Sequence, residues 1–124
     1  MDQREFIRKV AERSQLSKEE SADLTRAVLD ALGQRLSAGE VRDLVLQLPD
    51  PLAEAIHPKS KSPERFDLTE LIDRVSKRTG LNETETTAGV RAVLTTLRDA
   101  IDERVFNQVM SQLPSGFSKL AQPL

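Results

Sequence analysis

The sequence predicts an all-α protein in which two pseudo-symmetric repeats of three to four helices pack into one compact helical bundle. The first observation is an internal repeat: residues 1–52 and 66–117 align without a gap, and 15 of the 52 aligned pairs are identical. The second is the helical spacing of apolar residues in each copy, with no strand-like alternation. The expected organisation is a single domain (1–124) made of a first repeat (1–56), a linker (57–65) and a second repeat (66–121).

Length and composition restrict the possible classes of protein. A unit of about 50 residues buries too little surface to be stable alone, so we expect the two copies to share one core. The chain has no cysteine, which excludes disulfides, thiolate zinc sites and cysteine nucleophiles. No apolar run approaches the ~18 residues that a membrane span needs, and the N-terminus is charged from its second residue, unlike a signal peptide. We therefore expect a cytoplasmic protein without a membrane segment, present as a monomer or weak homodimer.

The first predicted helix of each copy begins after an aspartate that is followed three residues later by a glutamate. These pairs are Asp2 with Glu5 and Asp67 with Glu70. In such a capping box the acid reaches back to the amide of the cap residue. We expect these helices to end near Ser14 and near Thr79, where Gly80 is suited to a C-cap.

The second predicted helix of each copy begins with a further capping box and carries a long apolar stripe. The boxes are Ser17 with Glu20 and Asn82 with Glu85. The apolar residue that recurs every four positions is Leu24, Val28, Leu32 and Leu36 in the first copy, and Val93, Leu97 and Ile101 in the second. Gly89 stands where the first copy has Leu24. A glycine within a helix costs about 1 kcal/mol relative to alanine, so we expect close packing there, with a functional kink as the alternative.

The third predicted helix of each copy has the strongest helical spacing in the chain. Its core residues are Val41, Leu44, Val45 and Leu48 in the first copy, and Phe106, Val109, Met110 and Leu113 in the second. Ser37 with Glu40 is expected to form a capping box in the first copy, and Asp102 is the expected N-cap in the second, where Val105 replaces the acid. Pro49 and Pro114 end the helices, because the residue before a proline resists the helical conformation. Short fourth helices are expected at 51–56 and 115–121.

The repeated unit, with its Arg-Ala-Val-Leu segment and Gln-Leu-Pro ending, resembles the bacterial domain of unknown function 2267 family. The residues that carry the resemblance are Phe6, Ile7, Val10, Arg13, Leu16, Ala27, Val28, Leu29, Leu32, Gln47, Leu48 and Pro49, with their partners in the second copy. The resemblance covers nearly the whole chain as two copies. It implies a helical fold, and that family has no established activity.

A narrower resemblance links residues 68–97 to the first two helices of HU-type nucleoid proteins. In those proteins two chains interlock through these helices, so the resemblance implies two interlocked helical hairpins. Their DNA-binding arm is a basic β-hairpin, whereas residues 102–114 of this chain have the pattern of a helix. A pI near 5.5 and 3% aromatic residues also lack the footprint of nucleic-acid binding. We expect no nucleic-acid partner.

No set of residues predicts a catalytic, cofactor or metal site. His57 is the only histidine, and one imidazole without cysteine cannot build a usual zinc site. Arg26 and Arg91 are identical in the two copies and could contact an anion. Arg13 and Arg78 are a second arginine pair that is identical in the two copies. The alternative is that all these arginines bind surface acids such as Glu20 and Glu85 or cover the edge of the core.

An interaction surface is expected around the third helices and the segments that follow them. Its candidate residues are Leu46, Val105, Phe106, Met110 and Phe117. Leu46 and Val105 fall off the apolar stripe, and the aligned residues are Ser111 and Glu40. The alternative is that Phe106, Met110 and Phe117 belong to the core.

The function that we expect is that of a non-enzymatic helical domain which binds another protein. The alternative is a small-molecule binder with an apolar cleft between the two repeats, a usual place for ligands in helical bundles. A divergent enzyme is a third possibility that no specific residue supports. A flat apolar patch at the third helix would favour the first function, and a pocket lined by both copies would favour the second.

Overall fold

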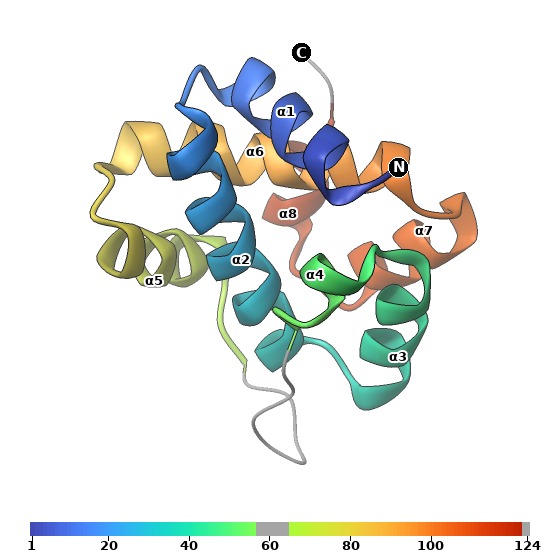
Figure 1. The fold of residues 1–124 in the computed structure, drawn as a ribbon. Coiled ribbons are helices and arrows are strands. Elements are labelled where there is room, and N and C mark those ends of the chain that lie inside the picture. Colours follow the sequence, from blue (N-terminus) through green and yellow to red (C-terminus); the bar gives the residue numbers. More distant parts are fainter. Residues whose placement is uncertain (57–64, 123–124) are drawn as a thin grey trace.

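The computed structural model describes residues 1–56 and 65–122, and all regular structure in these ranges is α-helical (Figure 1). The helices are α1 (Gln3–Ser14), α2 (Lys18–Arg35), α3 (Ala38–Gln47), α4 (Asp50–Ala53), α5 (Leu68–Thr79), α6 (Glu83–Ala100), α7 (Glu103–Ser111) and α8 (Ser115–Leu120). The expected all-α class is confirmed. The helix expected after residue 102 is also confirmed, as α7. His57 and most of the expected linker lie outside the described residues.

The N-cap residues are those expected from the sequence at α1, α2, α3, α5, α6 and α7, but the full capping box forms only at α2 and α6 among the described helices. Both halves of the capping box form at the start of α2, between Ser17 and Glu20, and at the start of α6. At α1 and α5 the cap aspartate accepts from the amide three residues on, but the expected return bond is not formed. At α5 the reason is visible: Glu70 Oε1 instead accepts from Arg74 Nε at 3.2 Å.

The first helix of each half packs on the second helix of the other half. α1 lies against α6 and α2, and α5 lies against α2 and α6, so these four helices form the body of the molecule (Figure 1). α3 packs against α7 beside this body, and α8 contacts α6. The helices therefore pack between the two halves as well as within each half.

The buried apolar residues form one continuous cluster that contains residues of all eight described helices. The stripes expected on α2 and α6 are buried from Leu24 to Leu36 and from Val93 to Ile101. The stripe on α3 is buried except for Val45, which is partly exposed and packs against the cluster. A shared core agrees with the marginal size of each half.

Gly89 of α6 packs directly against the Leu24 side chain of α2. A Cβ atom placed on Gly89 would lie 2.2 Å from Leu24 Cδ2, and Leu24 is fully buried. The expectation of close packing is therefore confirmed. Leu24 and Gly89 are aligned residues of the two halves, so equivalent positions face each other and the space holds one leucine side chain.

The side chains of two glutamines make hydrogen bonds that connect α3 with α7. Gln112 Oε1 accepts from the amide of Ser37 at 2.9 Å, and Gln112 Nε2 donates to Ser37 Oγ at 3.0 Å. In the same way, Gln47 Oε1 accepts from the amide of Asp102. Each glutamine thus satisfies the N-cap amide of the helix in the other half. At α3 the Gln112 side chain takes the place that Glu40 would have in a capping box.

Candidate functional site

The expected interaction surface is largely core. The exposed fractions are 2% for Val105, 3% for Phe106, 8% for Met110 and 0% for Phe117. The expectation that these four residues form a surface is therefore wrong. Leu46 is 78% exposed, which confirms its place off the apolar stripe.

The position of α7 explains the difference between the two third helices. α7 lies between α3 and α6, so its apolar side chains are covered on two sides. Val105 consequently joins Phe106, Val109 and Met110 in the core. It was expected outside the apolar stripe because it aligns with Glu40 of α3. The sequence pattern gives the period of a helix, but the width of its buried arc depends on how many neighbours cover it.

Arg13 and Arg78 bind acids across the two halves. Arg13 Nη2 lies 2.6 Å from Asp99 Oδ2, and its Nη1 donates to Thr96 Oγ1 at 3.1 Å. Arg78 Nη1 lies 3.0 Å from Asp30 Oδ2. These pairs tie α1 to α6 and α5 to α2. The acids are not the expected ones, because Glu20 and Glu85 are occupied in the capping boxes.

Arg26 and Arg91 are not brought together as an anion clamp. Arg26 Nη1 lies 3.8 Å from Asp23 Oδ1 on its own helix. Arg91 lines a cleft that does not include Arg26, and among the described residues no carboxylate lies within ion-pair distance of Arg91. The two identical arginines therefore have different surroundings, and of the two, Arg91 is the one without a carboxylate partner among the described residues.

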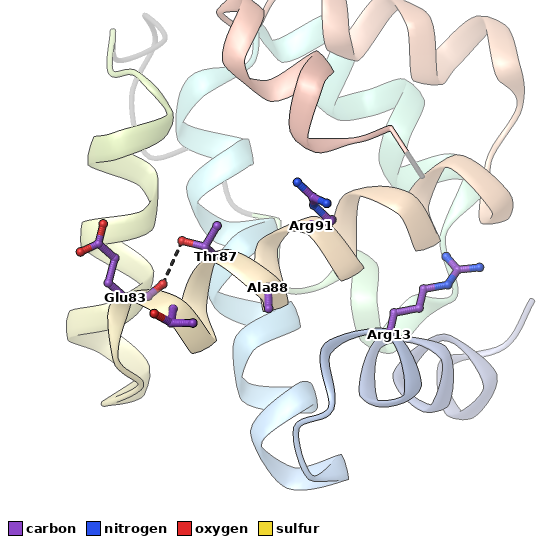
Figure 2. Close-up of a pocket in the computed structure, with 6 residues that line it drawn as sticks. Arg13, Glu83, Thr87, Ala88 and Arg91 are labelled. Atoms are coloured by element: carbon purple, nitrogen blue, oxygen red, sulfur yellow. Dashed lines mark hydrogen bonds between the residues drawn. The ribbon is translucent and has the colours of Figure 1, made fainter. Parts of the chain in front are cut away.

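The cleft at Arg91 has a volume of about 430 Å³ and lies between the end of α1 and the outer face of α6. Its lining residues are Arg13, Glu83, Thr84, Thr87, Ala88 and Arg91. Figure 2 shows that the side chains of Arg13 and Arg91 point in different directions and that Glu83 points away at the far end. Thr87 Oγ1 donates to the Glu83 carbonyl oxygen at 2.8 Å. The polar groups therefore do not converge on one atom, as the groups of a catalytic site do.

Sequence reasoning identified Arg91 but missed the residues around it. The signal was in the alignment of the two copies: the arginine is kept, while the residue three positions before it changes from Asp23 to Ala88. That change removes a carboxylate from one turn of helix. The replacement of Asp23 by Ala88 distinguishes the two arginines only when the structure shows which side chains surround each of them.

The described residues contain no group of three or more histidine, cysteine, aspartate or glutamate side chains that could hold a metal ion. The pKa of Lys77 is raised by a hydrogen bond and by the charge of Asp73, whose Oδ2 lies 2.8 Å from Lys77 Nζ. This is a solvent-exposed pair within one helix. It therefore marks no catalytic group. Within the described ranges, no helix is long and apolar enough to cross a membrane.

The comparison with known families gives an identity but no activity. A family model described as an uncharacterized conserved protein, DUF2267, matches residues 3–120, from α1 to the end of α8. The chain belongs to the DUF2267 family. A search of curated proteins finds no match to it. The function of this DUF2267 chain must therefore be argued from its own surface, and the finer expectations of two tandem family units and of likeness to HU-type proteins stay predictions.

Proposed function

We propose that this DUF2267 chain is a non-enzymatic helical domain that binds a protein partner through the outer face of α3. The observation that carries the proposal is the 78% exposure of Leu46. Among the described residues, the other exposed large apolar side chain is Met1, at 40%. Complete burial of a leucine side chain in an interface contributes about 1.5–3 kcal/mol.

The setting of Leu46 supports its use as a contact. Its neighbour Gln47 is bound to the cap amide of α7, which holds the end of α3 in place. Because the backbone of a fixed helix is already ordered, binding there has no cost of backbone ordering. The aligned residue on α7 is the exposed Ser111, so the two halves offer different surfaces to a partner.

The proposal includes a pseudo-two-fold relation between the halves. It is supported by aligned helices of equal length, with α1 and α5 at 12 residues and α2 and α6 at 18. It is also supported by the exchange of glutamine bonds between α3 and α7. If the two halves are related by a pseudo-two-fold axis, Leu46 provides an apolar contact that the aligned Ser111 of the other half does not.

The test is capture of partners from a native cell extract, measured by quantitative mass spectrometry. We expect Leu46→Ser to lose the captured partner while its thermal melting temperature stays unchanged, because the side chain is exposed. The matched control is the double variant Leu46→Ser with Ser111→Leu, which keeps the composition and moves the leucine to α7. It should not restore capture. Equal capture by all three proteins would contradict the proposal.

A second candidate function is small-molecule binding in the cleft between α1 and α6. Its support is that Arg13 comes from the first half and the other lining residues from the second. The cleft departs from the expected apolar one because charged residues line it. Titration of a set of charged and neutral fragments, followed by amide shifts in NMR spectra, tests it. Shifts confined to Thr87, Ala88 and Arg91 would support ligand binding there.

We further propose that the protein is cytoplasmic and is a monomer or weak homodimer.

We also propose that the protein does not bind nucleic acid. This proposal is supported by the net charge of −2, because a phosphate backbone finds no strong counter-charge. Gel-shift titration of duplex DNA at low salt is the most permissive test, because phosphate contacts are strongest there. Tight binding that persists near physiological salt would contradict this proposal.

A further inference from the structure

Arg26 and Arg91 are aligned residues of the two halves, but an acidic side chain precedes only Arg26 by three residues. On α2, the Asp23 carboxylate lies three residues before Arg26, and Oδ1 lies 3.8 Å from Nη1. On α6, the aligned residues are Ala88 and Arg91. Residues three apart are neighbours on a helix surface, so the methyl group of Ala88 stands where a carboxylate would otherwise accompany the arginine.

The second acidic neighbour of Arg26 is also absent from the α6 setting. Asp30, four residues after Arg26, aligns with Thr95, four residues after Arg91. Thr95 Oγ1 donates to the carbonyl of Arg91 at 3.0 Å and therefore brings no negative charge. Among the described residues, Arg91 is left without a carboxylate partner beside a cleft of about 430 Å³.

We infer that the cleft over Ala88 binds a single aliphatic carboxylate, which takes the place beside Arg91 that the Asp23 side chain has beside Arg26. This inference rests on the second candidate function, ligand binding in the α1–α6 cleft. The carboxylate can belong to a free small acid or to an acidic side chain of a peptide. The chemistry is the same in both cases.

The charges of the cleft favour a monoanion. The Arg13 guanidinium is neutralised by Asp99 at 2.6 Å, so it adds no free positive charge. Glu83 lies eight residues before Arg91, about 12 Å along the helix, and would repel a second anionic group. Ala88 and Thr87 belong to the lining, and side chains with methyl groups suit an alkyl chain better than a phosphate. One uncommitted guanidinium remains to bind one carboxylate.

The test uses the full chain and two probes that carry a carboxylate. One is sodium propionate, and the other is the blocked peptide N-acetyl-Gly-Glu-Gly-amide, so that the two arms separate a free acid from an acidic side chain. Sodium chloride at equal ionic strength and sodium phosphate are the controls. The measured signals are the backbone amides of residues 87–91 and the Nε–H resonance of Arg91 in ¹H–¹⁵N NMR spectra. We expect saturable shifts at millimolar probe, because an exposed ion pair is weak.

Two variants remove the site in different ways. Arg91→Gln removes the guanidinium, and Ala88→Asp supplies an internal carboxylate that imitates Asp23. Each should weaken propionate binding by about tenfold or more, because the single charge-assisted contact is lost or occupied. Ala88→Asp is expected to fold, because Asp23 already occupies the aligned position of α2. The matched control is Arg26→Gln, which should leave the shifts within about twofold.

The outcomes separate this inference from the function on which it rests. Equal shifts with chloride, tighter binding of phosphate, no saturable shift with either carboxylate probe, or equal weakening by Arg26→Gln would overturn the carboxylate assignment. A neutral fragment that shifts residues 87–91 while propionate does not would also overturn it, yet would leave ligand binding in the cleft standing. Shifts with the peptide alone would support the carboxylate and identify its source as a side chain.

Discussion

Gln15 and Gly80 end the first helix of each half in the left-handed backbone conformation. Their φ values are 65° and 78°, and Gln15 is the non-glycine residue with positive φ among the described residues. Glycine adopts this conformation without the steric cost that other residues have. Gln15 partly offsets that cost, because its Nε2 donates to the Glu12 carbonyl at 2.8 Å. The same turn is thus built from a strained residue in one half and a relaxed one in the other.

We expect Gln15→Gly to raise the free energy of unfolding by about 0.5–1 kcal/mol, because the helix end loses its strained residue. The reciprocal variant, Gly80→Gln, should lower it by about 1–2 kcal/mol, because the space around Gly80 is open and the backbone strain alone decides. Urea unfolding measures both changes. A loss of stability in Gln15→Gly would mean that its bond to Glu12 outweighs the strain.

Gly89 and Leu24 give a second prediction about single residues. Gly89→Ala should destabilise the protein by about 1–3 kcal/mol through overpacking, which exceeds the gain in helix propensity of about 1 kcal/mol. In a Leu24→Ala background the same change should stabilise by up to about 1 kcal/mol, because the added methyl group no longer meets Leu24. Unfolding of the four proteins forms a double-mutant cycle. The same sign in both backgrounds would show that Leu24 is not the obstacle.

Whole elements are positioned by bonds that join the end of one helix to the start of another. Gln112 connects the end of α7 to the N-cap of α3, and Gln47 makes the corresponding connection from α3 to α7. These bonds account for the glutamine before each Leu-Pro ending, for which the sequence pattern alone offers no explanation. They also hold the helix that carries Leu46.

Gln112→Met should lower the free energy of unfolding by about 1–3 kcal/mol, because the partly buried Ser37 amide loses its acceptor. Hydrogen exchange of the first amides of α3 should accelerate with it. The matched control is Gln108→Met on α7, whose Oε1 is buried without a hydrogen-bond partner. That change should be neutral or stabilising. If both variants lost the same stability, side-chain volume rather than the cap bond would be responsible.

The whole molecule is held together mainly by contacts between its halves. α1 packs on α6 and α5 on α2, and the ion pairs of Arg13 with Asp99 and of Arg78 with Asp30 cross between the halves. Each half alone would expose the apolar faces that the other half covers. The cooperative unit is therefore expected to be the entire chain.

We expect residues 1–60 and 62–124, made as separate chains, to be largely unfolded or to self-associate. Mixed in equal amounts, they should regain the helical circular dichroism and the single melting transition of the intact protein. Analytical ultracentrifugation of each half and of the mixture provides the measurement. Two halves that each melt cooperatively as monomers would contradict a shared core.

The sequence by itself determined where helices begin and end, because caps, prolines and apolar spacing act over a few residues. Ser17, Asn82 and Pro49 fix helix limits through their immediate neighbours, and the structure confirms them. The same local information was enough to predict that Leu46 is exposed. It identified Arg91 as a candidate contact, but it gave no means to separate Arg91 from Arg26.

Only the tertiary structure decided which faces are covered, because that depends on residues far apart in the chain. Val105 and Phe117 are buried because neighbouring helices cover α7 and α8, and the alignment of Val105 with Glu40 of α3 could not show how wide the covered face of α7 is. Gln112 meets Ser37 across 75 positions, and the cleft beside Ala88 needs Arg13 from the far half. Local interactions select helices, whereas burial, cross-half bonds and clefts arise only where the helices meet.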